Sequence, residues 1–177
     1  VEIDKEIIST INNGKVHISE KGLGELVKKA VDSKKLLAND KPIKSNIYII
    51  AVPTPFYKDQ ISKIKKPNVE YVINAAKAIS KVLGKNDLVI LESTSPVGTT
   101  ELVSEIISKE ANIEKNDLNI AYCPERVLPG EIIKELINND RVIGGLNNRS
   151  SLLAKSFYEK FCKGKLIITN SKTAELV

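Results

Sequence analysis

The sequence predicts an α/β domain, doubly wound around a mostly parallel sheet. Short runs rich in β-branched residues alternate with longer amphipathic stretches along the chain. Several runs, such as Ile47–Val52, are nearly all apolar, as expected of strands buried on both faces of a parallel sheet. The repeated order of strand, helix and strand favours right-handed crossovers, with helices on both faces. The predicted strands are Val1–Asp4, Asn46–Val52, Asp87–Glu92, Asn119–Tyr122, Arg141–Gly144 and Leu166–Thr169.

The stretches between these runs have the spacing of amphipathic helices. Val69–Leu83 carries an apolar stripe of helical period. Thr99 is the predicted N-cap of a helix over Glu101–Ile107, whose first acidic residue suits the positive end of the helix dipole. A helix over Lys5–Ile11 is closed by Asn12-Asn13-Gly14, which is typical of a left-handed stop. Two further helices are predicted at Leu26–Val31 and Ser151–Phe161.

Composition narrows the class of protein. The net charge is +5, but the lysines are spread along the chain and aromatic residues make up only 5%, so we expect a solvated surface and no nucleic-acid partner. The longest apolar run is too short to cross a bilayer, and no signal peptide opens the chain, so no membrane association is expected.

The two cysteines, Cys123 and Cys162, are too few for a disulfide framework, which favours reduced thiols and a cytoplasmic location. No metal site is expected. Because the chain lacks methionine and opens on what reads as a strand end, we expect a segment before Val1.

Ligands of an open parallel sheet bind beyond the carboxyl ends of its strands, so the residues that follow each run are the candidates. Asp4 ends the first run of this chain. An acid at the tip of the second strand of a Rossmann unit accepts hydrogen bonds from both hydroxyls of the adenine ribose, although Asp4 also suits a helix N-cap. Thr54 stands between Pro53 and Pro55, which stiffen the turn and hold the threonine in place.

Two later turns carry more candidates. Thr94 lies in Glu92–Thr100, where hydroxyls and a predicted helix N-terminus form a donor-rich pocket suited to a phosphate or an amide. Arg126 is one of only three arginines among 27 basic residues, and its planar fork suits a phosphate or a carboxylate. A surface pair between Glu125 and Arg126 is the alternative.

These strand ends together resemble the UDP-sugar 6-dehydrogenases, the family that contains UDP-glucose and UDP-N-acetyl-mannosamine dehydrogenases. Each motif alone is weakly specific, but they extend from one end of the chain to the other in family order. The matching segments are Val1–Asp4, Ile11–Gly14, Ile50–Pro55, Leu91–Thr100, Tyr122–Gly130, Arg141–Gly145 and Thr169–Glu175. The Pro-Glu-Arg-Val-Leu-Pro-Gly loop at 124–130 is similar to the UDP-N-acetyl-mannosamine branch. UDP-glucose enzymes typically carry Pro-Glu-Phe-Leu-Arg-Glu-Gly there, so Pro129 replaces their second glutamate and its acid–base role is not carried over.

The resemblance implies a Rossmann-like NAD-binding domain over residues 1–171 that lacks its first strand and glycine loop, followed by the start of a central connecting helix at 172–177. It implies that NAD is the cofactor and that Asp4, Thr54 and Thr94 bind it. The family's reaction sends two successive hydrides from the sugar C6 to two NAD molecules, through a thioester on a cysteine. That cysteine, with the family's lysine and asparagine, is expected beyond Val177, so the chain alone is expected to be inactive and Cys123 to be a packing residue.

The implied reaction oxidises UDP-N-acetyl-D-mannosamine to UDP-N-acetyl-D-mannosaminuronic acid for polysaccharide biosynthesis, in a homo-oligomer. Arg126 and Val127 would contact the UDP-sugar, and Glu125 would lie near the reacting carbon in a catalytic role. Three alternatives stay open. They are the same chemistry on UDP-N-acetyl-glucosamine or UDP-glucose, a Rossmann dehydrogenase of small hydroxy acids, and a non-catalytic nucleotide-sensing module.

Overall fold

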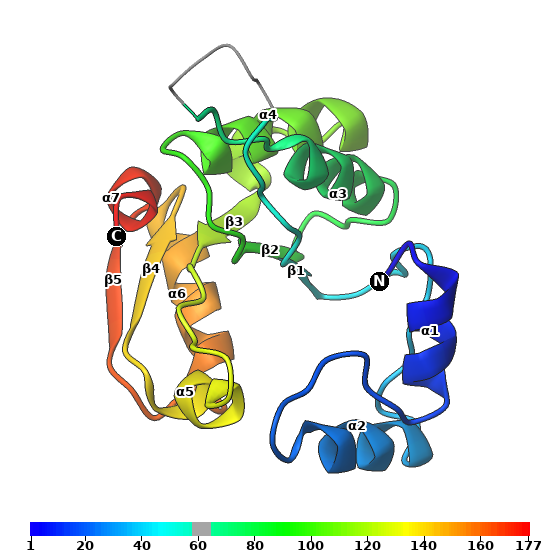
Figure 1. Cartoon of the computed structure of the whole chain (residues 1–177). Helices are drawn as coiled ribbons and strands as arrows, with labels where there is room; N and C mark the ends of the chain where they lie inside the picture. The colour runs from blue at the N-terminus through cyan, green and yellow to red at the C-terminus, as the bar shows by residue number, and fades with distance from the viewer. Residues whose placement is uncertain (58–64) are drawn as a thin grey trace. The chain divides into compact units, whose positions relative to one another are not determined.

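The computed structural model describes residues 1–57 and 65–177, which form two compact units (Figure 1). The helical unit comprises Val1–Ile43 and Arg126–Asn138, and the sheet unit comprises Lys44–Glu125 and Asn139–Val177. The chain therefore leaves the sheet unit after Glu125 and returns to it at Asn139.

The sheet unit is built on one five-stranded sheet whose strands lie in sequence order. Neighbouring strands are parallel except for the third and fourth, which are antiparallel. This arrangement confirms the predicted mostly parallel sheet. The strands are β1 (Ile47–Ile50), β2 (Leu88–Leu91), β3 (Asn119–Tyr122), β4 (Arg141–Gly145) and β5 (Leu166–Asn170).

Helices cover both faces of this sheet, because alternate residues of each strand point to opposite sides. Along β2, Val89 and Leu91 join one apolar core with residues of α3 (Glu70–Ser80) and α4 (Thr99–Ala111). Leu88 and Ile90 join a second core with Ala154 and Tyr158 of α6 (Asn148–Tyr158). All four β2 residues are buried, as the apolar pattern predicts for an inner strand. The unit also contains a short 3-10 helix (Lys115–Asp117) and α7 (Ser171–Glu175).

One close backbone approach ties β4 to the end of β5. A Cβ on Gly144 would collide with the backbone oxygen of Asn170, so only glycine fits this position. Asn170 also caps α7, because its side chain accepts a hydrogen bond from the Thr173 amide at 2.9 Å. The assignment of residues 172–177 to a longer central helix stays a prediction.

The helical unit contains α1 (Lys5–Asn12), α2 (Leu23–Asp32) and α5 (Ile132–Asn138). None of its residues is fully buried, so the apolar faces of these helices are only partly covered. Gly14 follows α1 with a φ of 70°, in agreement with the predicted left-handed stop.

The prediction of a strand at Val1–Asp4 was wrong. A strand needs a neighbour to satisfy its backbone groups, and these residues use other partners. The Glu2 amide donates to the Asn39 oxygen at 2.9 Å, and the Glu2 carboxylate accepts from the amides of Ile3 and Asp4. The predicted N-cap Thr99 was also wrong. Thr99 is the first residue of α4, and Gly98 precedes the helix in a left-handed conformation with a φ of 95°.

Candidate functional site

The carboxyl ends of β1, β2 and β3 lie at one edge of the sheet. The three strands are parallel, and their last residues, Ile50, Leu91 and Tyr122, are aligned across the sheet. The segments that follow them carry Thr54, Thr94 and Glu125, three or four residues beyond the strand ends. The sheet unit therefore gathers three of the predicted site residues on adjacent segments at the edge where ligands of parallel sheets bind.

Ser93 joins the segments that carry the two threonines. Its hydroxyl donates to the Val52 oxygen at 2.8 Å and accepts from the Val52 amide at 2.8 Å. Ser93 is buried by this contact, whereas Thr94 is exposed and Thr54 is half-buried. Two hydroxyls on segments joined in this way fit a ligand rich in ribose, phosphate and amide groups, as NAD is.

Part of the donor-rich turn predicted in Glu92–Thr100 already binds a carboxylate of the same chain. Glu175 of α7 accepts from the Gly98 amide at 2.7 Å, from the Thr100 amide at 2.7 Å and from the Thr100 hydroxyl at 2.5 Å. The Thr99 hydroxyl donates to the Pro96 oxygen at 2.6 Å. The start of α4 therefore binds an internal carboxylate, and the suitability of the rest of this turn for a ligand phosphate or amide stays a prediction. Thr94 is the exposed hydroxyl of this turn.

Asp4 belongs to the helical unit, where it caps α1. Its carboxylate accepts from the amides of Glu6 at 2.8 Å and Ile7 at 3.3 Å, which stabilises the helix start. The side chain is exposed. The cap is thus established, and a second role on a ribose stays a prediction.

Arg126 and Val127 open the segment of the helical unit that follows β3. Arg126 is exposed and Val127 is half-buried. Glu20 fixes the far end of this loop, because its carboxylate accepts from the amides of Gly130 at 2.8 Å and Ile132 at 3.1 Å. Because Arg126 and Asp4 belong to one unit and Thr54 and Thr94 to the other, the convergence of these four side chains stays a prediction.

The sheet edge also carries an arginine that the sequence pattern did not single out. Arg141 begins β4, and because β4 runs antiparallel to β3, its first residue lies at the carboxyl edge of the parallel strands. Its Nη2 atom lies 2.7 Å from Oε2 of Glu125, in an ion pair. Glu125 therefore pairs with buried Arg141. A charged residue at the head of the apolar run Arg141-Val142-Ile143 was the signal available in the sequence.

Glu92, Cys123 and Tyr158 surround this ion pair. The Tyr158 hydroxyl donates to Oε1 of Glu92 at 2.5 Å, and the Arg141 guanidinium lies 4.6 Å from the centre of the Tyr158 ring. Burial raises the pKa of the Glu92 carboxyl and of the Tyr158 hydroxyl. Burial also raises the pKa of the Cys123 thiol to about 11, so this thiol is protonated at neutral pH and suits packing rather than nucleophilic attack.

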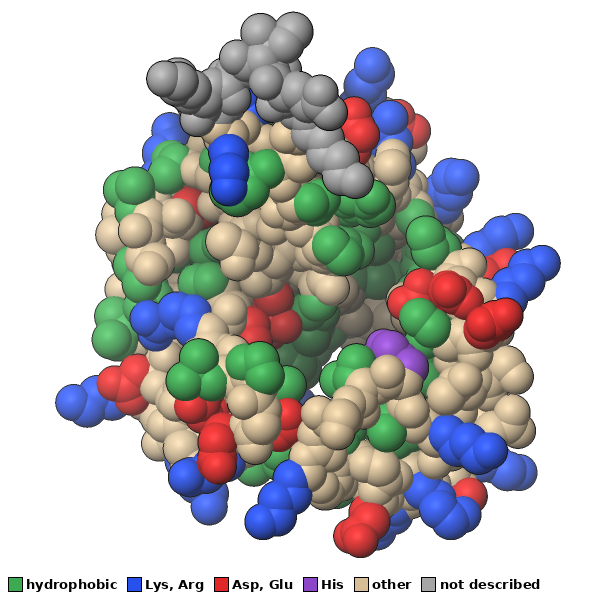
Figure 2. All heavy atoms as spheres, in the orientation of Figure 1, with side chains coloured by type: hydrophobic (Ala, Val, Ile, Leu, Met, Phe, Trp, Pro, Cys, Tyr) green, Lys and Arg blue, Asp and Glu red, His purple; other side chains and the backbone are tan. Residues whose placement is uncertain are grey.

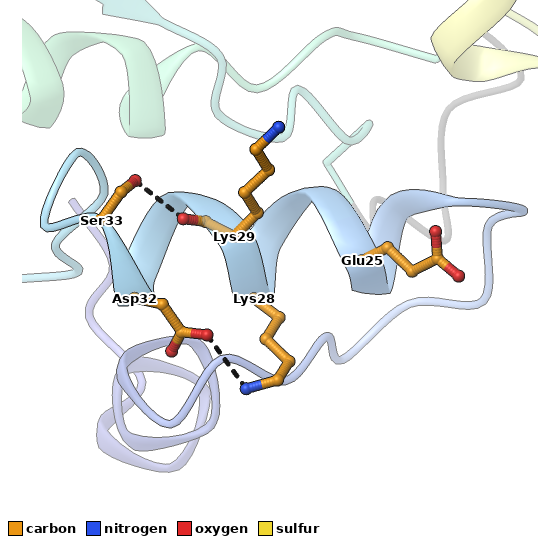
Figure 3. A pocket seen from close by; sticks show the side chains of 5 residues that line it. All are labelled: Glu25, Lys28, Lys29, Asp32 and Ser33. Carbon is orange, nitrogen blue, oxygen red and sulfur yellow. Dashed lines mark hydrogen bonds and ion pairs between the residues drawn. The ribbon is translucent and has the colours of Figure 1, made fainter.

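The surface hollow on α2 offers no comparable chemistry (Figure 3). Two of its four charged side chains bind each other, since Lys28 pairs with Asp32 at 3.0 Å, and the Ser33 hydroxyl donates to the Lys29 backbone oxygen at 2.7 Å. On the face drawn in Figure 2, Lys and Arg side chains stand apart with acidic side chains among them. Within residues 1–57 and 65–177, no group of three or more His, Cys, Asp or Glu side chains is placed to hold a metal ion. In the same residues, no helix has both the length and the apolar character needed to span a bilayer.

Comparison with known proteins agrees with the geometry of this edge. Residues 1–162 match the UDP-glucose/GDP-mannose dehydrogenase family, NAD binding domain. The chain is 46% identical to the UDP-N-acetyl-D-mannosamine dehydrogenase of Campylobacter jejuni, over 99% of this chain and 44% of that protein. It is 44% identical to the NDP-N-acetyl-D-galactosaminuronic acid dehydrogenase of Ralstonia solanacearum, over 99% of this chain and 42% of that protein. The chain thus spans less than half the length of the curated relatives it matches.

A solved structure gives the same result for the fold. The UDP-N-acetyl-mannosamine dehydrogenase of Staphylococcus aureus superposes with a TM-score of 0.91 at 34% identity, over 99% of this chain and 41% of that one. The family match, the sequence identity and the structural superposition therefore point to the same family over nearly the whole chain. The chain belongs to the UDP-glucose/GDP-mannose dehydrogenase family, to which it contributes the NAD-binding domain.

Proposed function

We propose that this chain is the cofactor-binding part of an NAD-dependent dehydrogenase that oxidises UDP-N-acetyl-D-mannosamine at C6 to UDP-N-acetyl-D-mannosaminuronic acid. The observation that carries the proposal is the 46% identity, over 99% of the chain, to a protein named for this activity. The loop Pro124–Gly130, which resembles the same branch of the family, supports it. NAD, when bound, supplies the acceptor for each hydride.

Each predicted residue has a distinct part in the proposal. Asp4 accepts hydrogen bonds from the adenine ribose, while Thr54 and Thr94 donate to NAD at the sheet edge. Arg126 binds the UDP-sugar with Val127 beside it, since a guanidinium fork suits a diphosphate. Glu125 lies near the reacting carbon, where a carboxylate orders a water or accepts a proton.

A second substrate class is favoured by one comparison. The Ralstonia solanacearum protein, named as an NDP-N-acetyl-D-galactosaminuronic acid dehydrogenase, is 44% identical over the same share of this chain. The two relatives differ by only two percentage points in identity, so overall similarity does not choose between the sugars. UDP-N-acetyl-glucosamine and UDP-glucose are further substrates of the same reaction type to compare.

The test is NADH formation by the full-length protein that carries this domain, supplied separately with each of these UDP-sugars and with UDP-N-acetyl-galactosamine. We expect the highest kcat/KM with UDP-N-acetyl-D-mannosamine, and two NADH for each sugar oxidised. One NADH per sugar would contradict the four-electron reaction, and a preference for another sugar would move the proposal to that substrate. NADH formation by residues 1–177 alone would contradict the proposal that the nucleophile lies outside them. Assembly as a homo-oligomer and a cytoplasmic location are also proposed, and light scattering and cell fractionation of the full-length protein test them.

A further inference from the structure

We propose that Arg141 is a positioning residue for Glu125, holding its carboxylate in place at the carboxyl edge of the sheet. This inference rests on the proposed function, in which Glu125 lies near the reacting carbon. The resemblance includes the segment Arg141–Gly145 but gives Arg141 no role, and the inference assigns it one in turnover.

The ion pair has a buried end and an accessible end. The Arg141 side chain is 3% exposed and that of Glu125 is 22% exposed, while Nη2 and Oε2 are 2.7 Å apart. A buried guanidinium is expensive to desolvate, so this arginine is retained at a cost that a surface lysine would avoid. The partly exposed carboxylate is the end that a ligand can reach.

Arg141 is itself held from several sides. Its amide donates to the Lys165 oxygen at 2.8 Å, and its guanidinium lies over the rings of Tyr158 at 4.6 Å and Phe161 at 6.0 Å. Burial acts to lower the pKa of Arg141, but the hydrogen bond and negative charge of Glu125 outweigh it and raise that pKa, so the guanidinium stays charged. A fixed, permanently charged guanidinium whose Nη2 donates to Oε2 of Glu125 is suited to holding that carboxylate in place.

The position of Glu125 along the chain makes this restraint useful. Glu125 is the last residue of the sheet unit before the chain leaves it, and Arg141 lies two residues after Asn139, where the chain returns. The ion pair therefore connects the residues of the sheet unit that flank the segment carrying Arg126 and Val127. Without the ion pair, the Glu125 carboxylate would have one restraint fewer at the point where the chain leaves the sheet unit.

The experiment compares Arg141→Lys with Arg149→Lys in the full-length protein. Arg149 is a matched control because it is an exposed arginine of the same unit, with a 3.3 Å hydrogen bond to Asn86. A lysine at 141 keeps the charge but replaces the planar guanidinium over the Tyr158 ring with a compact ammonium, so we expect kcat for sugar oxidation to fall about 100-fold, the size of effect that a misplacement of a reacting group by about 1 Å can have. The KM for NAD should stay within about twofold, and Arg149→Lys should match the unsubstituted protein. Calorimetric titration with the UDP-sugar alone gives a second readout. If Arg141→Lys affects turnover but not binding, the affinity for the UDP-sugar stays within about threefold of that of the unsubstituted protein.

A double-mutant cycle covers the case in which an Arg141 variant fails to fold. Glu125→Gln with Arg141→Gln removes both charges, so no buried charge is left unpaired. If Arg141 acts through Glu125, this double variant has the same kcat as Glu125→Gln alone, and a further loss of kcat in the double variant overturns the inference. Normal turnover by Arg141→Lys also overturns it and leaves the proposed function standing. Absence of NADH formation by the unsubstituted protein with every sugar rejects the proposed function and this inference together.

Discussion

At the scale of single residues, burial separates side chains that react from side chains that support. Thr94 is exposed and Glu125 is partly exposed at the sheet edge, whereas Cys123, two residues before Glu125, has no exposed surface. Arg141 is buried beside the same edge and pairs with Glu125. Cys123 and Glu125, only two residues apart, thus face different surroundings.

The Cys123 thiol should resist alkylation in the folded protein. Its pKa is raised to about 11 by burial, so at about pH 8 roughly a thousandth of it is the reactive thiolate. Iodoacetamide followed by peptide mass spectrometry should leave Cys123 unmodified, with the reaction growing only as pH rises toward that pKa. Cys162, which is partly exposed, is the internal reference, and urea should make both react. Equal labelling of the two cysteines under native conditions would contradict this prediction.

At the scale of elements, the direction of β4 decides which side chains share the ligand edge. The apolar run Arg141–Gly144 predicted a strand, and the structure has one at Arg141–Gly145. An apolar pattern has no direction, however, so the antiparallel pairing with β3 could not be predicted and neither could the place of Arg141. α5 was also missed, because seven residues with helical spacing are too few for a pattern to identify. By contrast, the threonine positions followed from the strand ends, because parallel strands present their carboxyl ends at one edge.

Glu175 is expected to stabilise α4 through its two capped amides. Oε2 accepts from the Gly98 amide and Oε1 from the Thr100 amide, so a glutamine would place an NH₂ donor against one of them. Glu175→Gln should lower the free energy of unfolding by about 1 kcal/mol, the usual scale for losing a helix cap. Urea denaturation followed by circular dichroism measures the change.

Glu110→Gln is the control for this helix. Glu110 is exposed near the carboxyl end of α4, where a negative charge opposes the helix dipole, so its removal should be neutral or slightly stabilising. If the two variants unfold at the same urea concentration, Glu175 contributes no measurable cap.

At the scale of the whole molecule, the two units differ in how much apolar surface they bury. The sheet unit contains both apolar cores, and all four residues of β2 and of β3 are buried. The helical unit contains no fully buried residue, although α1 and α2 are amphipathic. Because burial of apolar surface is the main favourable contribution to folding, the two units should open with different free energies.

Native-state hydrogen exchange of residues 1–177 measures this difference directly. Amides of β2 and β3 should exchange only through global unfolding, at a free energy of roughly 5–15 kcal/mol for a domain. Amides of α1 and α2 should exchange through local opening at a smaller free energy, and low concentrations of denaturant should change their rates little, because local opening exposes little new surface. Mass spectrometry of peptides from each helix and strand reports both quantities. Equal protection and equal denaturant dependence in α1, α2, β2 and β3 would show instead that the helical unit unfolds only together with the sheet.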